Sequence, residues 1–197
     1  MERILKSSFA ALLLIGALIG LAAPPAFAQN AAADPAPDAT AAAAAATPSA
    51  VGTFKSWSAY TFEDKGRLMC YTQSDPENTI GKVASRGSAA VMVIQAPDAA
   101  AKDQVSIVLG FLPQDGKNVT VTIGAKAGKG KKFTLKKFAV GRAWAESSSQ
   151  DKQIVSAMKR YNYLVVDAIS KNGEKVRDTY YLTGFGKAYD ASVKACK

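Results

Sequence analysis

The chain has 197 residues, of which 25 are Lys or Arg and 16 are Asp or Glu, so its formal net charge is +9 at pH 7. It contains no histidine and only two cysteines. This composition excludes Ser-His-Asp and Cys-His arrangements, histidine-based metal sites and the usual general base near neutral pH.

The N-terminal segment has the layout of a cleavable secretory signal. Arg3 and Lys6 precede an almost wholly apolar run over residues 9–23, and Ala26-Phe27-Ala28 places small residues at the two positions that a signal peptidase reads. A membrane anchor is the alternative, but this run is short for a hydrocarbon layer of about 30 Å. We therefore expect cleavage of residues 1–28 and no transmembrane segment afterwards.

The next segment is composed almost entirely of Ala, Pro, Asp and Thr. Without large apolar side chains, it cannot offset the entropy lost when a backbone is ordered. We predict that residues 29–51 form a disordered tether. Residues 52–197 are then a single domain, long enough to bury a hydrophobic core.

Export changes how the two cysteines are interpreted. Oxidising compartments allow disulfides to form, and two cysteines allow one intrachain pair, Cys70 with Cys196. They do not form a C-x-x-C motif, so a thioredoxin-like redox role is not indicated. The pattern favours a structural disulfide.

Strand patterns dominate the domain. Alternating or continuous apolar runs are separated by turn signals, and Asn172-Gly173 between two such runs is the strongest short hairpin signal. The predicted strands cover residues 56–62, 67–73, 89–96, 103–111, 118–123, 131–135, 161–170 and 174–185.

Residues 147–160 have the pattern of an amphipathic helix. They open with serines suited to capping, and Ile154, Val155 and Met158 then fall on one face. Such a stripe is typical of core packing, and we expect the neighbouring Trp144 to be structural as well.

A second helix is expected after Gly186. Tyr189, Val193 and Cys196 recur at i, i+4 and i+7, so Cys196 points with the apolar contacts and could pin the last helix to the strand that carries Cys70. Short strands with two small helices predict a mainly all-β fold, a β-sandwich with one inserted helix and a C-terminal helix.

Basic residues are concentrated in the domain. Removing Arg3 and Lys6 leaves 23 basic residues, and removing Glu2, Asp34 and Asp38 leaves 13 acidic ones, a net charge of +10. Six lysines crowd a predicted hairpin: Lys126, Lys129, Lys131, Lys132, Lys136 and Lys137.

Such a cluster attracts phosphate- or sulfate-bearing polymers and anionic lipid surfaces. Phe133 and Leu135 should face the core and support the charges from behind. The alternative is a hairpin that lysines keep soluble and protect from edge pairing. Nucleic acid is not an expected partner, because export separates the protein from it.

Carboxylates are the acid–base groups that remain, and no spacing among them singles out a catalytic pair. Most lie in predicted turns. Asp167 and Asp178 lie within strands, where they could pair with Arg177 or Lys175 or face solvent.

Four stretches of the domain resemble, in the same order, the invasion-associated locus B family of alphaproteobacterial exported proteins. They are WSAYTFEDKGRLMCYTQSDP (57–76), VSIVLGF (105–111), AWAESSSQDKQIVSAMKR (143–160) and DTYYLTGFGKAYDASVKAC (178–196). The resemblance implies an immunoglobulin-like β-sandwich, a periplasmic or outer-surface location and, for some members, a link to host-cell entry. It brings no catalytic residue and no cofactor.

The sequence departs from that family at two places. The turn before DTY is usually of a Ser-Arg-Gly-Thr type, whereas here it contains Ser170-Lys171-Asn172-Gly173. If the turn carries binding specificity, this member differs. The long Ala/Pro tether is also additional.

Two functions from different classes follow. The first is a non-enzymatic envelope protein that binds an anionic envelope or host-surface polymer or lipid, supporting invasion or envelope integrity. The second is an exported hydrolase of envelope polymers that uses carboxylates. A small-ligand carrier is a third hypothesis, and it requires an apolar pocket. No cofactor or metal is expected, and the oligomeric state is not indicated.

Overall fold

The computed structural model describes residues 47–96 and 102–197. The predicted signal peptide and most of the predicted tether lie outside the described residues. Within them no helix is both long and apolar enough to cross a membrane.

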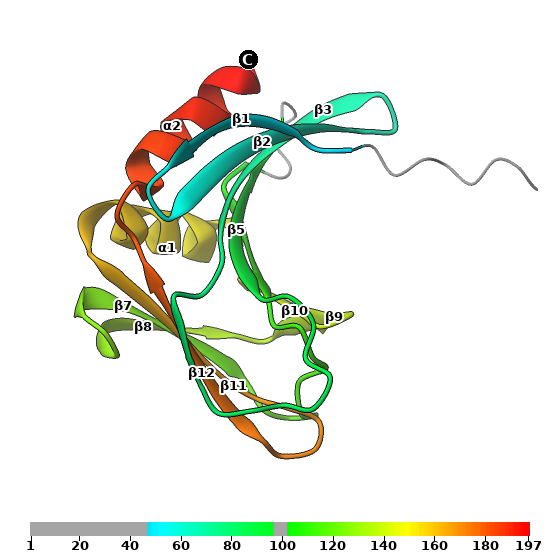
Figure 1. Ribbon diagram of the computed structural model, residues 1–197, viewed down its shortest axis with the longest axis vertical. Coiled ribbons are helices and arrows are strands. Elements are labelled where there is room, and N and C mark those ends of the chain that lie inside the picture. The colour runs from blue at the N-terminus through cyan, green and yellow to red at the C-terminus, as the bar shows by residue number, and fades with distance from the viewer. Residues whose placement is uncertain (1–46, 97–101) are drawn as a thin grey trace, which may run out of the picture. The chain divides into compact units, whose positions relative to one another are not determined.

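Seven strands form an antiparallel sheet in the order β1-β2-β3-β5-β6-β10-β9 (Figure 1). Their bounds are β1 Ser49–Phe54, β2 Trp57–Asp64, β3 Arg67–Ser74, β5 Ala90–Gln95, β6 Gln104–Val108, β9 Lys137–Ala139 and β10 Arg142–Trp144. Five further strands form a second antiparallel sheet in the order β4-β12-β11-β7-β8. Their bounds are β4 Asn78–Ile80, β7 Val119–Lys126, β8 Lys129–Leu135, β11 Tyr163–Ile169 and β12 Lys175–Tyr181.

The core lies between the two sheets. Strand alternation turns Val93 and Ile107 of the first sheet and Val121 and Val166 of the second into one buried cluster. The Trp57 indole also donates a hydrogen bond to the Tyr181 carbonyl at 2.8 Å, which joins β2 to β12. The predicted all-β sandwich with two helices is confirmed.

The structure corrects the predicted start of the domain. Residues 49–51 were expected in the tether but belong to β1, which pairs with β2 from Ser49↔Thr61 to Phe54↔Trp57. Hydrogen bonds to a neighbouring strand hold this segment, so it needs few large apolar side chains of its own. The predicted Asn172-Gly173 hairpin is confirmed, since β11 and β12 pair from Tyr163↔Tyr181 to Ile169↔Lys175.

Helix α1, Ser148–Arg160, is anchored at its first turn. The Ser147 hydroxyl accepts a hydrogen bond from the Gln150 amide at 3.3 Å, and buried Asp151 accepts one from the Val105 amide of β6 at 2.8 Å. The predicted stripe is core, because Ile154 and Met158 are buried. Trp144 is only half-buried.

Helix α2, Phe185–Ala195, packs along β1, β2 and β3. Phe185 is buried and meets the Trp57 ring edge-on, with centroids 4.8 Å apart. At the other end, Cys196 and Cys70 form a disulfide with a Cα–Cα distance of 5.8 Å. The helix is therefore fixed at both ends, by an aromatic contact and by a covalent bond.

Asp178 forms a buried ion pair that the sequence did not predict. Its expected partners were Arg177 or Lys175, but Arg86 of the loop 81–89 binds it, with two guanidinium nitrogens at 2.9 and 2.5 Å. The expectation failed because Asp178 shares the inner face of β12 with Val176 and Tyr180. The hydrogen bond that Arg86 donates to Asp178 raises the pKa of Arg86, outweighing the lowering effect of burial.

Replacing Cys196 with Ser should destabilise the fold. The disulfide closes a loop across a separation of 126 residues, and the chain-entropy model gives about 4–5 kcal/mol for such a loop before any strain is deducted. Denaturant unfolding should show this loss, and hydrogen exchange should show α2 opening first. Reductant should reproduce the loss in the parent and have no effect on the variant. Two free thiols in mass spectra of the native protein would contradict the disulfide.

Met158→Ala should lower the free energy of unfolding by about 2–5 kcal/mol, because the side chain is 1% exposed and its removal leaves a cavity. Ser156→Ala on the exposed face of the same helix is the matched control and should stay within about 0.5 kcal/mol of the parent. Equal melting curves for the two variants would show that the stripe is not core.

Arg86→Met should lower the free energy of unfolding by about 3–5 kcal/mol, since it leaves the Asp178 carboxylate buried without its cationic partner. The side chains of Arg86 and Asp178 are 15% and 3% exposed. Arg177→Met is the control, because the Arg177–Asp167 pair has side chains 51% and 36% exposed; breaking it should cost about 1 kcal/mol or less. Urea titrations measure the free energy of unfolding of both variants. Similar losses in the two would contradict the expectation that the buried pair contributes more than the exposed one.

Candidate functional site

The predicted lysine hairpin is formed by β7 and β8. The strands pair from Val119↔Leu135 to Lys126↔Lys129, with a register shift after Ile123. A side chain at Gly124 would place its Cβ 1.8 Å from the Lys129 carbonyl oxygen, so the strands approach closely at the irregularity.

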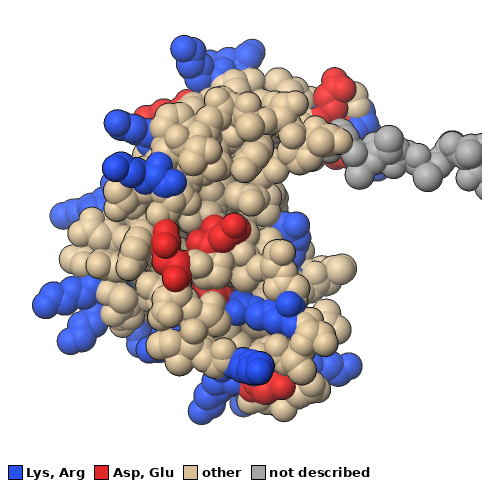
Figure 2. Space-filling model, viewed as in Figure 1, with Lys and Arg blue, Asp and Glu red and all other residues tan. Residues whose placement is uncertain are grey.

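The inner face of β8 holds the hairpin to the core. Phe133 and Leu135 are 4% and 0% exposed, as their spacing predicted. The outward residues therefore project from a strand that is fixed from behind. Figure 2 shows basic side chains along the side of the domain that contains α1, α2 and this hairpin.

All six predicted lysines are exposed, but they do not form one compact patch. Lys126 and Lys129 flank the tip, whereas Lys137 lies on β9, in the other sheet. The eight residues from Lys129 to Lys136 span about 23 Å along the strand direction. Because the Debye length is about 8 Å at physiological salt, the two ends act as separate charges along a line.

Three of the six lysines have partners. Lys131 donates to the Gln153 side chain at 3.0 Å, Lys136 forms an ion pair with Glu146 at 3.4 Å, and Lys137 donates to the Glu146 carbonyl at 2.7 Å. Lys126, Lys129 and Lys132 make no such contact with the described part of the chain. The cluster thus divides into a partnered trio (Lys131, Lys136 and Lys137) and a free trio (Lys126, Lys129 and Lys132).

A polar trough of ≈ 610 Å³ separates β8 from the start of α1. Lys131, Lys132 and Lys136 line one wall, and Glu146 and Ser147 line the other. Since Glu146 neutralises Lys136 across the trough, the trough is less basic than the lysine count suggests.

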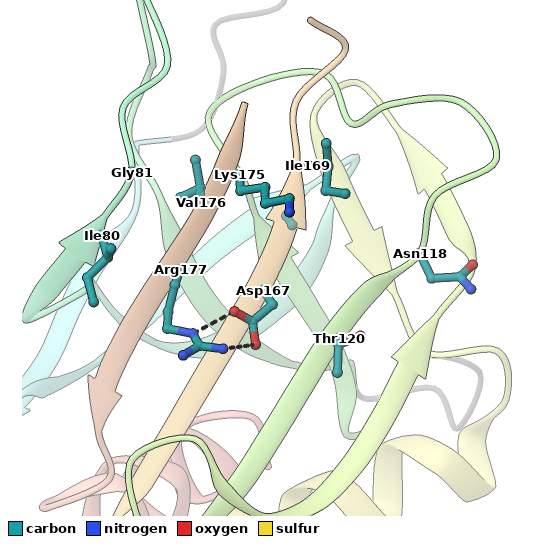
Figure 3. A pocket seen from close by; sticks show the side chains of 10 residues that line it. Ile80, Gly81, Asn118, Thr120, Asp167, Ile169, Lys175, Val176 and Arg177 are labelled. Atoms are coloured by element: carbon teal, nitrogen blue, oxygen red, sulfur yellow. Dashed lines mark hydrogen bonds and ion pairs between the residues drawn. The ribbon is translucent and has the colours of Figure 1, made fainter. Parts of the chain in front are cut away.

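The outer face of the second sheet carries a shallow groove of ≈ 450 Å³ between β4 and β7. At its centre Asp167 and Arg177 point toward each other from β11 and β12, with nitrogen–oxygen distances of 2.6 and 3.2 Å (Figure 3). Asp167 therefore has one of its two predicted partners. Ile80 and Ile169 supply apolar walls.

Three carboxylates that lie on regular elements are engaged within the protein. Asp167 binds Arg177, Asp178 binds Arg86, and Asp151 accepts the Val105 amide. Burial raises the pKa of Asp151, while that hydrogen bond lowers it. Among residues 47–96 and 102–197, no group of three or more His, Cys, Asp or Glu side chains is placed to hold a metal ion.

A third cavity lies where the β1–β2 turn meets the helices, and sequence reasoning did not identify it. Its basic residues are Lys55, Lys159, Arg160 and Lys187. They are scattered over the chain, so no local charge pattern could have revealed them.

The family described as Invasion associated locus B (IalB) protein matches residues 57–193. No curated protein matches the chain. Among solved structures, the crystal structure of invasion associated protein b from Bartonella henselae is similar, with 15% sequence identity, coverage of 73% of this chain and 95% of that chain, and a TM-score of 0.48. The family match begins at the first residue of β2 and ends within α2, and so covers most of both sheets. This chain belongs to the Invasion associated locus B family.

Proposed function

We propose that this chain is a non-enzymatic exported protein of the cell envelope, in the periplasm or at the outer surface. It supports host-cell invasion or envelope integrity by binding an anionic polymer or lipid surface. The name of its family supports the link to invasion. The signal-like N-terminus supports export.

The observation that carries this proposal is the line of exposed lysines on the β7–β8 hairpin. Two buried side chains, Phe133 and Leu135, hold the hairpin, and the free trio points charges at solvent without a carboxylate partner in the described residues. Lysine makes point-charge contacts and fixes little geometry. A row of such charges suits a repeating anion, such as a phosphate- or sulfate-bearing polymer or a lipid surface.

The engaged carboxylates weigh against the hydrolase alternative. A general acid or nucleophile needs a carboxylate that can reach substrate, and Asp167, Asp178 and Asp151 are bound to arginine or to a backbone amide. Individual Asp and Glu substitutions test this point, since an enzyme would lose activity on an envelope polymer at one or two positions.

Changing Lys126, Lys129 and Lys132 together to Gln should weaken binding to anionic vesicles on the order of 100-fold, given about 1 kcal/mol per lysine at such a surface. The measurement is co-sedimentation with phosphatidylglycerol vesicles, repeated with heparin and lipopolysaccharide at low and high salt. Affinity of the parent should fall as salt rises.

The matched control is the partnered trio changed to Gln, which removes the same charge. It should weaken binding less, because Lys131 and Lys136 already have partners within the protein. Thermal melts establish that both triple variants are folded. If both variants bind as tightly as the parent, the lysines serve only solubility and the proposal fails.

A further inference from the structure

A cavity of ≈ 570 Å³ opens where the β1–β2 turn, the end of α1 and the start of α2 meet, and we call it the α2 pocket. The two helices and the turn lie together on one side of the domain (Figure 1). Its volume falls within the range of about 300–1,000 Å³ that is usual for small-molecule sites.

The floor of the α2 pocket is apolar. Met158 and Leu182 are buried beneath it, and the partly buried rings of Phe54 and Tyr161 pack against the same core. A hydrocarbon or ring placed here would exchange water for apolar contacts, which is favourable in proportion to the area covered.

The rim of the α2 pocket is basic. Lys55, Lys159, Arg160 and Lys187 line it, and no Asp or Glu does. Among the described residues, no carboxylate forms an ion pair with any of the four. These unneutralised like charges repel one another around the cavity, so an anion there would be attracted by all of them.

Two of these cations are held in place by aromatic rings. The Lys159 ammonium lies 3.6 Å from the centroid of the Tyr189 ring, and the Arg160 guanidinium lies 5.7 Å from that of Tyr161. A cation–π contact positions a charge without cancelling it. This differs from the lysine hairpin, where a carboxylate neutralises Lys136.

Close backbone contact fixes the geometry of the α2 pocket. Gly184, with φ 96°, has so little room that a Cβ there would lie 1.8 Å from the Phe54 carbonyl oxygen. Next to it, Lys55 adopts φ 60°, as the first central residue of the two-residue β1–β2 turn, so the hairpin fixes its backbone. The first turn of α2 also contains no acidic residue that would repel an anion.

We propose that the α2 pocket binds a small amphipathic anion, in which one carboxylate or phosphate group is joined to a short apolar chain. The basic rim takes the anionic group and the apolar floor takes the chain. This site shares no residue with the lysine hairpin, and its ligand is a single molecule rather than a polymer.

The test is calorimetric titration of the disulfide-bonded protein with decyl phosphate and decanoate, both kept below the concentrations at which they form micelles. Decanol and inorganic phosphate are the comparison probes, since each has half of the required chemistry. The two amphipathic anions should bind at least about tenfold more tightly than either comparison probe. Preference between them shows whether a phospholipid-like or a fatty-acid-like group is the better fit.

A variant with Lys55→Gln and Lys187→Gln should lose about tenfold in affinity for decyl phosphate. Lys117→Gln with Lys152→Gln removes the same charge from exposed positions outside the α2 pocket and should leave binding unchanged. The free-trio variant should also bind normally, which separates this site from the hairpin. Equal losses in the two double variants, or binding of inorganic phosphate as tight as that of decyl phosphate, would overturn the proposal.

Discussion

Arg86 connects three parts of the sandwich through one side chain. Its guanidinium binds Asp178 of β12, its Nε donates to the Leu109 carbonyl just after β6 at 3.0 Å, and its Cζ lies 5.3 Å from the Phe111 ring centroid. The second sheet, the end of the first sheet and the loop 81–89 therefore share one buried charge pair. A carboxylate in this position has a high desolvation cost, so the packing of β12 depends on the loop holding Arg86 beside Asp178.

The same carboxylate extends the connection to the edge of the sheet. The Thr79 hydroxyl of β4 donates to Asp178 at 2.7 Å, and β4 is a three-residue strand that pairs only through Asn78, Thr79 and Ile80. A strand so short gains little from its own hydrogen bonds. Its position, and with it the Ile80 wall of the groove, depends on Asp178 being held by Arg86.

The sequence predicted the elements that are specified by a pattern within their own residues. Val105 and Ile107 alternate within β6, Ile154 and Met158 repeat along α1, and Asn172-Gly173 marks the hairpin that joins β11 to β12. The sequence did not predict strands β1, β4, β9 and β10. Each lies at or next to a sheet edge, and all but β1 are only three residues long. Hydrogen bonds to neighbouring strands, rather than side-chain periodicity, hold them in place. The partner of Asp178 lies 92 residues away in a loop without periodic pattern, so no spacing could indicate it.

Charge density along the sequence also did not indicate where cations without carboxylate partners gather in the fold. Six lysines adjacent in sequence spread along a strand and into a second sheet, and Glu146 neutralises one of them. Lys55, Lys159 and Lys187 are far apart in the chain, yet Gly184 lets the β1–β2 turn touch α2 and brings them to one cavity. The disulfide from Cys196 to Cys70 keeps the far end of α2 against β3. Electrostatic attraction for a small anion therefore depends on backbone contacts and chain topology, whereas attraction for a long polyanion can follow from charge that is merely dense along the sequence.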